Sequence, residues 1–230
     1  MTSQIIALGG GGFSMEPDNP LLDHYVLNAC PADTPRITLL PTASGDADRL
    51  IAQFYTSFHR YPCRPRHVSL FRQTNDMAHR LLDSDVIYVT GGNTRNMLAI
   101  WEAAGVTELL REAWESGIVL AGVSAGAICW FEQGHTDSRG DLSPLDCMGW
   151  LSGSCSPHYD GEVNRKPSFE NLLQQGQIKP GLALDDGVAA HYVGAERTRL
   201  VSSRPRAQAR WITTEDGLLK ESRLSVDFLG

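Results

Sequence analysis

The sequence predicts an α/β protein whose mostly parallel sheet carries helices on both faces. Short apolar runs alternate with longer segments in which apolar residues recur at helical spacing, a pattern typical of parallel strands joined by helical crossovers. After about residue 135 turn residues become frequent, which indicates an antiparallel extension of the sheet. The chain has 230 residues, 42% of them hydrophobic, and we expect residues 1–230 to form a single domain.

Each predicted parallel strand is an apolar run short enough to cross a sheet once, and several end at glycine or proline. These runs are residues 5–8, 36–40, 67–70, 86–89 and 118–122. The segments between them have the apolar period of helices. Helices are predicted over residues 46–60, from a cap at Asn75 to about Leu82, and over residues 94–116 with a break at Gly105.

The later part of the chain predicts strands more than helices. Residues 149–153 have the pattern of a short strand, and residues 181–194 that of two β runs around an Asp-Gly turn. Residues 197–203 and 206–215 have the pattern of a terminal β run or hairpin. We therefore expect a parallel core first and the antiparallel extension after it.

Composition excludes several classes of function. The net charge of -7 is spread along the chain, which argues against nucleic acid or an anionic membrane as the partner. The amino terminus lacks the features of a secretion signal, and no apolar run approaches the length of a membrane span. The five cysteines lack the spacing of a disulfide framework or a zinc site. We expect a cytoplasmic protein without a metal or other cofactor, either a monomer or a homodimer.

Ligands of parallel α/β sheets collect where the strands end, and three loops of this sequence qualify. They are "GGGGFS" at residues 9–14, "TGGNT" at residues 90–94 and the turn at Ser124. The first loop is not a dinucleotide fingerprint, because Ser14 stands where the third glycine is required. A tight turn in which the backbone passes close to another segment is the interpretation that this glycine run favours.

The turn at Ser124 has the pattern of a nucleophile elbow. The sequence Gly-x-Ser-x-Gly follows a predicted strand and precedes a predicted helix, as such an elbow requires. Small neighbours, here Gly122, Ala125 and Gly126, leave room for a strained turn, and the following helix would aim free N–H groups at an oxyanion. The alternative is a small-residue contact between a helix and the sheet.

A serine nucleophile needs a base to take its proton. His158 is the preferred base, because it lies in a turn-rich loop directly after the strand predicted at residues 149–153. His191 lies within an apolar β run, where a packing role is the default. His135 is expected beyond the helix that starts at Ser124.

The acid that would orient the base is left open among four aspartates. Asp186 stands beside Asp185 at the predicted Asp-Gly turn, and Asp137 and Asp141 follow the helix predicted after the serine. Because Asp-Gly is a favoured turn pair, Asp186 could serve the turn alone. The order Ser…His…Asp differs from that of α/β-hydrolases, whereas an acid at Asp137 or Asp141 would restore a lipase or esterase interpretation.

Four segments in order resemble the peptidase E family of serine peptidases, which contains aspartyl dipeptidases and has cyanophycinase as a relative. The segments are "VIYVTGGNTRNML", "GVSAGAICWF", "SPHY" and "GLALDDGVA", and "LLPTASGD" at residues 39–46 resembles the second strand and loop of the family. The resemblance runs from about Ile5 to about Val193. It implies a three-layer, flavodoxin-like sandwich similar to that of class I glutamine amidotransferases.

The resemblance implies a role for each matching residue. Ser124 matches the nucleophile and His158 the base. Asp186 falls where the family often has a glutamate, so a shorter carboxylate must approach the imidazole more closely. The amides of Ala125 and Gly92 would form the oxyanion hole.

The substrate contacts implied by the resemblance are less specific. Asn93 would shape the TGGNT loop, and Asp137 matches a family acid that would recognise or support the substrate amine. Because family dipeptidases remove an N-terminal aspartate, a cation should meet the substrate carboxylate. Arg165 and Lys166 are the candidates, and Arg139 is another.

Taken together, these residues predict a serine peptidase that hydrolyses dipeptides or short peptides from the N-terminus, with Asp-Xaa as the substrate that the resemblance implies. An acyl-enzyme would form on Ser124. One alternative is an esterase-type serine hydrolase that uses the early "GGGGFS" loop as its oxyanion hole. Another is a non-catalytic, amidotransferase-like binding protein.

Overall fold

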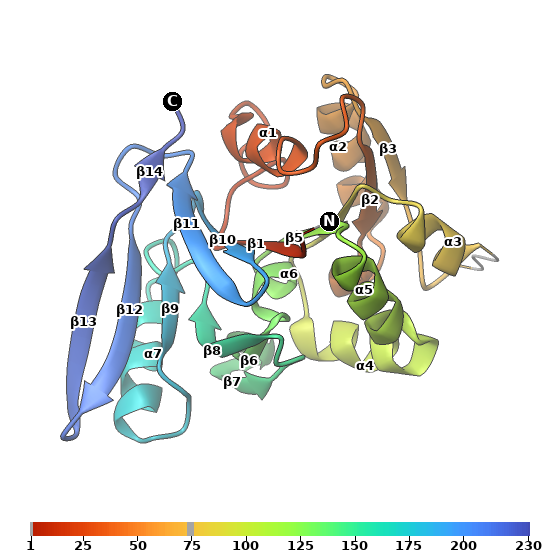
Figure 1. The fold of residues 1–230 in the computed structure, drawn as a ribbon. Coiled ribbons are helices and arrows are strands. Elements are labelled where there is room, and N and C mark those ends of the chain that lie inside the picture. The colour runs from red at the N-terminus through yellow and green to blue at the C-terminus, as the bar shows by residue number, and fades with distance from the viewer. Residues whose placement is uncertain (1, 73–75) are drawn as a thin grey trace.

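Two β-sheets organise the chain in a computed structural model that describes residues 2–72 and 76–230 (Figure 1). Within the described residues the larger sheet consists, in spatial order, of β14 (Asp227–Phe228), β11 (Glu196–Ser202), β10 (Val188–Val193), β1 (Gln4–Leu8), β5 (Val119–Val123), β4 (Val86–Val89), β2 (Arg36–Leu40) and β3 (Arg64–His67).

The larger sheet is mostly parallel, as predicted. In the described chain its five strands from β1 to β3 are parallel to one another, and β10 and β11 continue it in the antiparallel sense. The strand predicted at residues 67–70 is instead β3, three residues earlier. Because β3 lies at the edge of the sheet, polar side chains suit it, and Arg66 donates to the hydroxyl of Thr38 at 2.8 Å.

Helices cover both faces of this sheet (Figure 1). Those in the described residues are α1 (Leu21–Leu27), α2 (Asp48–Phe58), α3 (Met77–Leu82), α4 (Thr94–Ala104), α5 (Val106–Glu115), α6 (Ala125–Ile128) and α7 (Arg165–Gln174), with a 3₁₀ turn over Thr42–Ser44. Gly105, at a φ of 69°, separates α4 from α5 as predicted. The predicted cap Asn75 lies outside the described residues.

Alternate side chains of each central strand enter different cores. Ile6 and Leu8 of β1 pack with α1 and α2, whereas Ile5 and Ala7 pack with residues of α4, α5 and α6. Phe13, from the loop after β1, is fully buried in the first core. Burying such a ring contributes about 1.5–3 kcal/mol, so this packing anchors the glycine-rich loop that precedes Phe13.

The second sheet is an addition that the sequence interpretation did not contain. Within the described residues it consists, in spatial order, of β13 (Leu218–Leu224), β12 (Ala209–Glu215), β9 (Gly181–Leu184), β8 (Leu151–Ser156), β6 (Phe131–Arg139) and β7 (Asp141–Asp146). The two β runs predicted around the Asp-Gly turn are β9 and β10, but they do not pair with each other. β9 joins the smaller sheet and β10 the larger, so the turn carries the chain from one sheet to the other.

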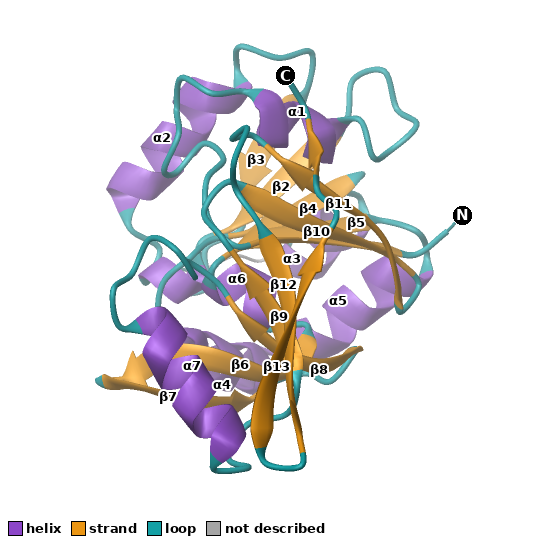
Figure 2. Cartoon of the chain, turned by 90° about the vertical axis from the view of Figure 1, so that its left-hand side faces the viewer, coloured by secondary structure: helices purple, strands orange, loops and turns teal. Residues whose placement is uncertain are grey.

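Helix α7 lies against the smaller sheet (Figure 2). Phe169 and Leu173 of α7 pack with Ala183 of β9 and Ile212 of β12, which fixes the loop between β8 and α7 at the junction of the two sheets. Among the described helices, none is both long and apolar enough to cross a membrane.

Candidate active site

The turn after β5 holds Ser124 in a strained backbone conformation. Its φ of 56° and ψ of -110° lie outside the regions that a non-glycine residue normally adopts. A methyl group on Gly122 would stand 2.3 Å from the carbonyl oxygen of Gly126, and one on Gly126 would stand 2.4 Å from that of Val89. Glycine at both positions is therefore what lets the chain reverse and present the serine, as in a nucleophile elbow.

His158 and Asp186 form a short hydrogen-bonded pair. Nδ1 of His158 lies 2.6 Å from Oδ1 of Asp186. Burial alone would raise the pKa of Asp186, but the hydrogen bond from His158 and the charges of His158 and Arg204 hold this pKa below its usual value. The carboxylate therefore stays ionised and accepts the Nδ1 proton, which leaves Nε2 of His158 as the basic nitrogen.

The end of β1 and the loop after it bring together, through backbone hydrogen bonds, the segments that carry the three candidate triad residues. Three consecutive carbonyl oxygens, those of residues 8–10, accept hydrogen bonds from segments that are far apart in the sequence. The pairs are Ser124 N with Leu8 O at 3.0 Å, His158 N with Gly9 O at 3.0 Å, and Gly187 N with Gly10 O at 3.1 Å. The glycine run thus passes close to other backbone, as the sequence predicts.

Two glycines enclose the carboxylate of Asp186. A methyl group on Gly10 would stand 2.0 Å from Oδ1 of Asp186 and 2.9 Å from Nδ1 of His158. A methyl group on Gly161 would stand 2.4 Å from Oδ2 of Asp186. The slot around the acid therefore has no room for a side chain on either wall.

The loop after β4 lies beside the elbow. A methyl group on Gly91 would stand 3.3 Å from Cβ of Ser124, so the two segments are in contact. Gly92 has a φ of 138° and packs directly on the carbonyl of Ala43. Within residues 2–72 and 76–230, the amides of Gly92 and Ala125 donate to no protein acceptor, so both are available to an oxyanion.

Asn93 holds this loop in place. Its Oδ1 accepts from the amide of Asn96 at 2.9 Å and caps α4, and its Nδ2 donates to the carbonyl of Ser138 at 3.1 Å. The side chain therefore ties the start of α4 to β6.

No hydrogen bond joins Oγ of Ser124 to His158 in the described chain. Hydrogen bonds between a nucleophile and its base are often long in unliganded sites.

The other acid at the turn and the other β-run histidine are engaged elsewhere. Asp185 accepts from Arg210 at 2.7 Å and from the amide of Gln208 at 2.9 Å, and burial raises its pKa. Nδ1 of His191 is hydrogen-bonded to the hydroxyl of Tyr25 at 2.8 Å.

His135 lies in β6, beyond the helix after the elbow as predicted; that helix is α6, a single turn. Its ring nitrogens are hydrogen-bonded to the hydroxyls of Ser156 and Ser168, and burial lowers its pKa to about 3. Asp141 begins β7 at an exposed position.

Asp137 lines an open pocket between the β6–β7 turn and the segment that leads from His158 into α7. The pocket has a volume of about 570 Å³, and its lining residues are Asp137, Gly140, Asp141, Leu142, Glu162, Val163, Asn164 and Ser168. Two hydrogen bonds hold the segments that line this pocket. Asn93 donates to the carbonyl of Ser138, next to Asp137, and the amide of Glu162 donates to the carbonyl of His158. Asp137 is exposed there.

The two cations suggested for substrate binding already have partners. Arg165 is 3% exposed, and its guanidinium donates to Glu162 at 2.6 Å and to the carbonyl of His135 at 2.8 Å. Lys166 is paired with Glu170 at 3.6 Å and Glu221 at 3.5 Å.

Sequence reasoning missed three charged residues around the acid. Asp160 accepts the amide proton of Asp186 at 2.7 Å. Arg204 lies 4.0 Å from Oδ2 of Asp186 and donates to Glu16 at 2.7 Å. No local pattern marks these residues, since each comes from a different loop. Proximity to the turn sequence "SPHYD" was the one available signal, and it applies to Asp160 alone.

Comparison with known proteins connects this arrangement to peptidases. The chain is 49% identical over 228 residues to a Bacillus subtilis (strain 168) protein named "Uncharacterized peptidase YgaJ", covering 99% of each chain. Among solved structures, a peptidase from an acI-B1 Actinobacterium superposes with a TM-score of 0.73 at 18% identity, covering 98% of this chain and 95% of that one. A Listeria monocytogenes EGD-e structure named "Putative Peptidase E Protein" superposes with a TM-score of 0.64 at 16% identity, covering 98% and 100%.

These two structural likenesses confirm the predicted flavodoxin-like α/β fold. Residues 5–200 match the family described as Peptidase family S51, which includes the elbow, the His158 loop and the turn between the two sheets. The chain therefore belongs to peptidase family S51.

Proposed function

We propose that the protein is a serine peptidase that hydrolyses dipeptides or short peptides through an acyl-enzyme on Ser124. The observation that carries this proposal is the strained elbow at Ser124, attached to the same loop that holds the His158–Asp186 pair. A strained nucleophile, a base with one nitrogen fixed by an ionised acid, and unpaired amides nearby are the groups that acyl transfer requires.

In the proposed mechanism, Oγ of Ser124 attacks the scissile carbonyl carbon while Nε2 of His158 takes the hydroxyl proton. Asp186 holds Nδ1–H and stabilises the imidazolium that forms. The amides of Ala125 and Gly92 donate to the oxyanion. The carbon–nitrogen bond then breaks as His158 protonates the leaving amine, and water repeats the sequence on the ester to release the N-terminal product and restore Ser124.

The loop after β1 supports peptidase chemistry in a different way from an esterase oxyanion loop. Its carbonyl oxygens at residues 8–10 accept hydrogen bonds from the amides of the triad segments, so we assign this loop a supporting role. As the donor we assign the loop after β4, because Gly91 lies against Ser124 and the neighbouring amide of Gly92 donates to no acceptor in the described residues.

For the substrate, we assign Asp137 to the N-terminal amine, because it is an exposed acid in the pocket that the segment after His158 also lines. A preference for Asp-Xaa belongs to the proposal on the family resemblance alone. Arg165 and Lys166 are already paired with carboxylates, so either would have to release a partner to bind a substrate aspartate.

The test is hydrolysis of Asp-Leu, Met-Leu and Lys-Leu, together with a short-chain p-nitrophenyl ester, by wild type and by Ser124→Ala. We expect release of free leucine from at least one dipeptide, and its loss in Ser124→Ala. Turnover of the ester alone would favour the esterase instead. Peptide hydrolysis at the wild-type rate in Ser124→Ala would refute the proposed nucleophile, and the ranking of the three dipeptides decides the aspartate preference.

A further inference from the structure

The second carboxylate oxygen of Asp186 faces an arginine that the triad description leaves out. Oδ1 binds His158, whereas Oδ2 lies 4.0 Å from Nη1 of Arg204. The stem of Arg204 crosses Gly187, because a methyl group there would stand 2.8 Å from Cγ of the arginine. The arginine therefore extends alongside the residue that follows the acid, with its charge behind the carboxylate.

A second set of contacts fixes Arg204 in this position. Glu16 accepts from Nε of Arg204 at 2.7 Å and, through its other oxygen, from the hydroxyl of Ser203 at 2.8 Å. The amide of Ser203 donates to the carbonyl of Gly187 at 2.8 Å. The side chain of Glu16 is only 14% exposed, so this ion pair is more shielded from solvent than an ordinary surface pair.

We propose that Arg204 is a positioning residue for the catalytic pair. Its charge keeps Asp186 ionised and sets the pH at which His158 can accept the proton of Ser124, and Glu16 moderates that charge. This inference rests on the proposed function. It assigns to Arg204 no contact with the substrate.

Several charged side chains surround the pair, and their partners explain why Arg204 is the one singled out. They are Glu16 after β1, Asp160 and Glu162 after β8, Arg165 in α7 and Arg204 after β11. Arg165 is engaged by Glu162 at 2.6 Å, and Asp160 is bonded to the Asp186 amide. Among described residues, Arg204 is the arginine or lysine that lies within 4.0 Å of the Asp186 carboxylate.

The sign of the effect follows from the charges. When the base is unprotonated, the His158–Asp186 pair carries one net negative charge, which a nearby cation stabilises; protonation brings the pair to neutrality. Removing the Arg204 charge should therefore move the acid side of the pH–rate profile to higher pH. Removing the Glu16 charge should move it to lower pH.

The experiment measures the rate at which a fluorophosphonate probe modifies Ser124 between pH 4 and 9. In this reaction the P–F bond breaks, the Oγ–P bond forms, His158 takes the proton and fluoride leaves. We expect the acid-side midpoint to rise by about half to one pH unit in Arg204→Met, to return toward wild type in Arg204→Lys, and to fall in Glu16→Gln.

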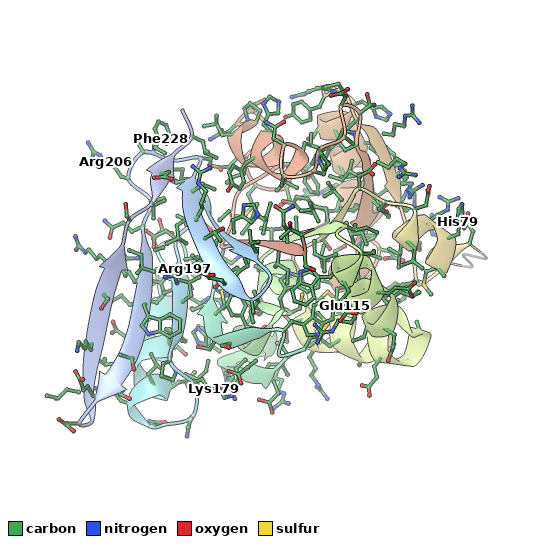
Figure 3. All side chains as sticks on the ribbon, viewed as in Figure 1. His79, Glu115, Lys179, Arg197, Arg206 and Phe228 are labelled. Carbon is green, nitrogen blue, oxygen red and sulfur yellow. The ribbon has the colours of Figure 1, made fainter. Side chains whose placement is uncertain are left out.

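Arg206→Met is the matched control. Arg206 lies in the same loop and lines the same small cavity as Arg204 and Asp160, but its side chain points outward from the molecule (Figure 3). In the described chain it makes no ion pair. The acid-side midpoint of the Arg206→Met variant should stay at the wild-type value. Equal midpoints in wild type, Arg204→Met and Glu16→Gln would overturn the inference, as would a shift of both variants in the same direction.

The probe separates this inference from the proposed function. If Ser124 is modified but no peptide is hydrolysed, the peptidase proposal fails while the midpoints still decide the role of Arg204. If peptides are hydrolysed but the midpoints do not move, the inference about Arg204 fails while the peptidase proposal stands.

Discussion

At the residue scale, the candidate site depends on positions where a side chain is excluded. Gly10 and Gly161 enclose the Asp186 carboxylate, and Gly122 and Gly126 allow the elbow. Sequence patterns could identify the elbow, because glycine, serine and glycine stand close together in the chain. They could also indicate a close backbone approach for the glycine run. They could not identify what approaches Gly10, because that partner is 176 positions later, at Asp186.

Replacing Gly10 by alanine should impair catalysis more than stability. The new methyl group would stand 2.0 Å from Oδ1 of Asp186 and 2.9 Å from Nδ1 of His158, so the pair must separate. We expect kcat to fall by about 100-fold or more, as when the orienting acid is lost. Steady-state kinetics and thermal unfolding measure the two effects. Gly194→Ala is the control, because a methyl group at Gly194 would have no heavy atom within 4 Å. Only the φ of 59° disfavours alanine there. It should cost about 1 kcal/mol of stability and leave kcat unchanged.

The two adjacent aspartates should respond in opposite ways to replacement by asparagine. Asp186→Asn removes the acid on His158 and should lower kcat by about three to four orders of magnitude. Asp185→Asn weakens the pairing of Arg210 and should lower the free energy of unfolding by about 1–3 kcal/mol, with kcat within about threefold of wild type. Kinetics and urea unfolding of both variants decide this, and a larger kcat loss in Asp185→Asn would exchange the two roles.

At the element scale, the strands and helices were predictable where their pattern is local. The parallel strands could be located because buried strands are continuous apolar runs. The edge strand β3 could not, since an edge tolerates Arg64 and Arg66. Two β runs were predicted around the Asp-Gly turn, yet the strands found there, β9 and β10, lie in different sheets. Turn chemistry fixes how the chain bends, whereas the partners of each strand are set by distant segments.

The cap of α4 provides a prediction at this scale. Asn93 caps the helix through Oδ1 and reaches β6 through Nδ2. Asn93→Ala should lose about 1 kcal/mol of stability and also reduce kcat, because the loop with Gly92 is released. Asn93→Asp keeps the cap oxygen and loses the donor to Ser138, so its stability should lie closer to wild type while its kcat falls. Urea unfolding and kinetics separate the contribution of the helix cap from that of the bond to Ser138. An unchanged kcat in both variants would show that this loop does not contribute to catalysis.

At the scale of the whole molecule, stability should depend on pH through a buried acid. Asp23 in α1 is 2% exposed and accepts from the amide of Phe13 at 3.1 Å. Burial raises its pKa to about 7. Because the unfolded chain releases this proton near its ordinary value, the stabilising contribution is complete at low pH. It is lost as pH rises toward and through about 7.

Asp23→Asn should remove this dependence, since asparagine stays neutral and keeps an oxygen for Phe13. Compared with wild type, we expect the variant to be more stable by about 4 kcal/mol at pH 8 and by only about 1 kcal/mol at pH 4.5. Denaturant unfolding at both pH values measures the difference. An equal effect of the substitution at the two pH values would show that Asp23 does not titrate in this range.

The most direct test of the central claim is mass-spectrometric mapping of the protein after reaction with a fluorophosphonate probe. The account predicts one modified residue, Ser124, with no modification in Ser124→Ala and a rate at least about 100-fold lower in His158→Ala. Modification of another residue, or none at Ser124 while Ser124→Ala still hydrolyses peptides, would contradict it.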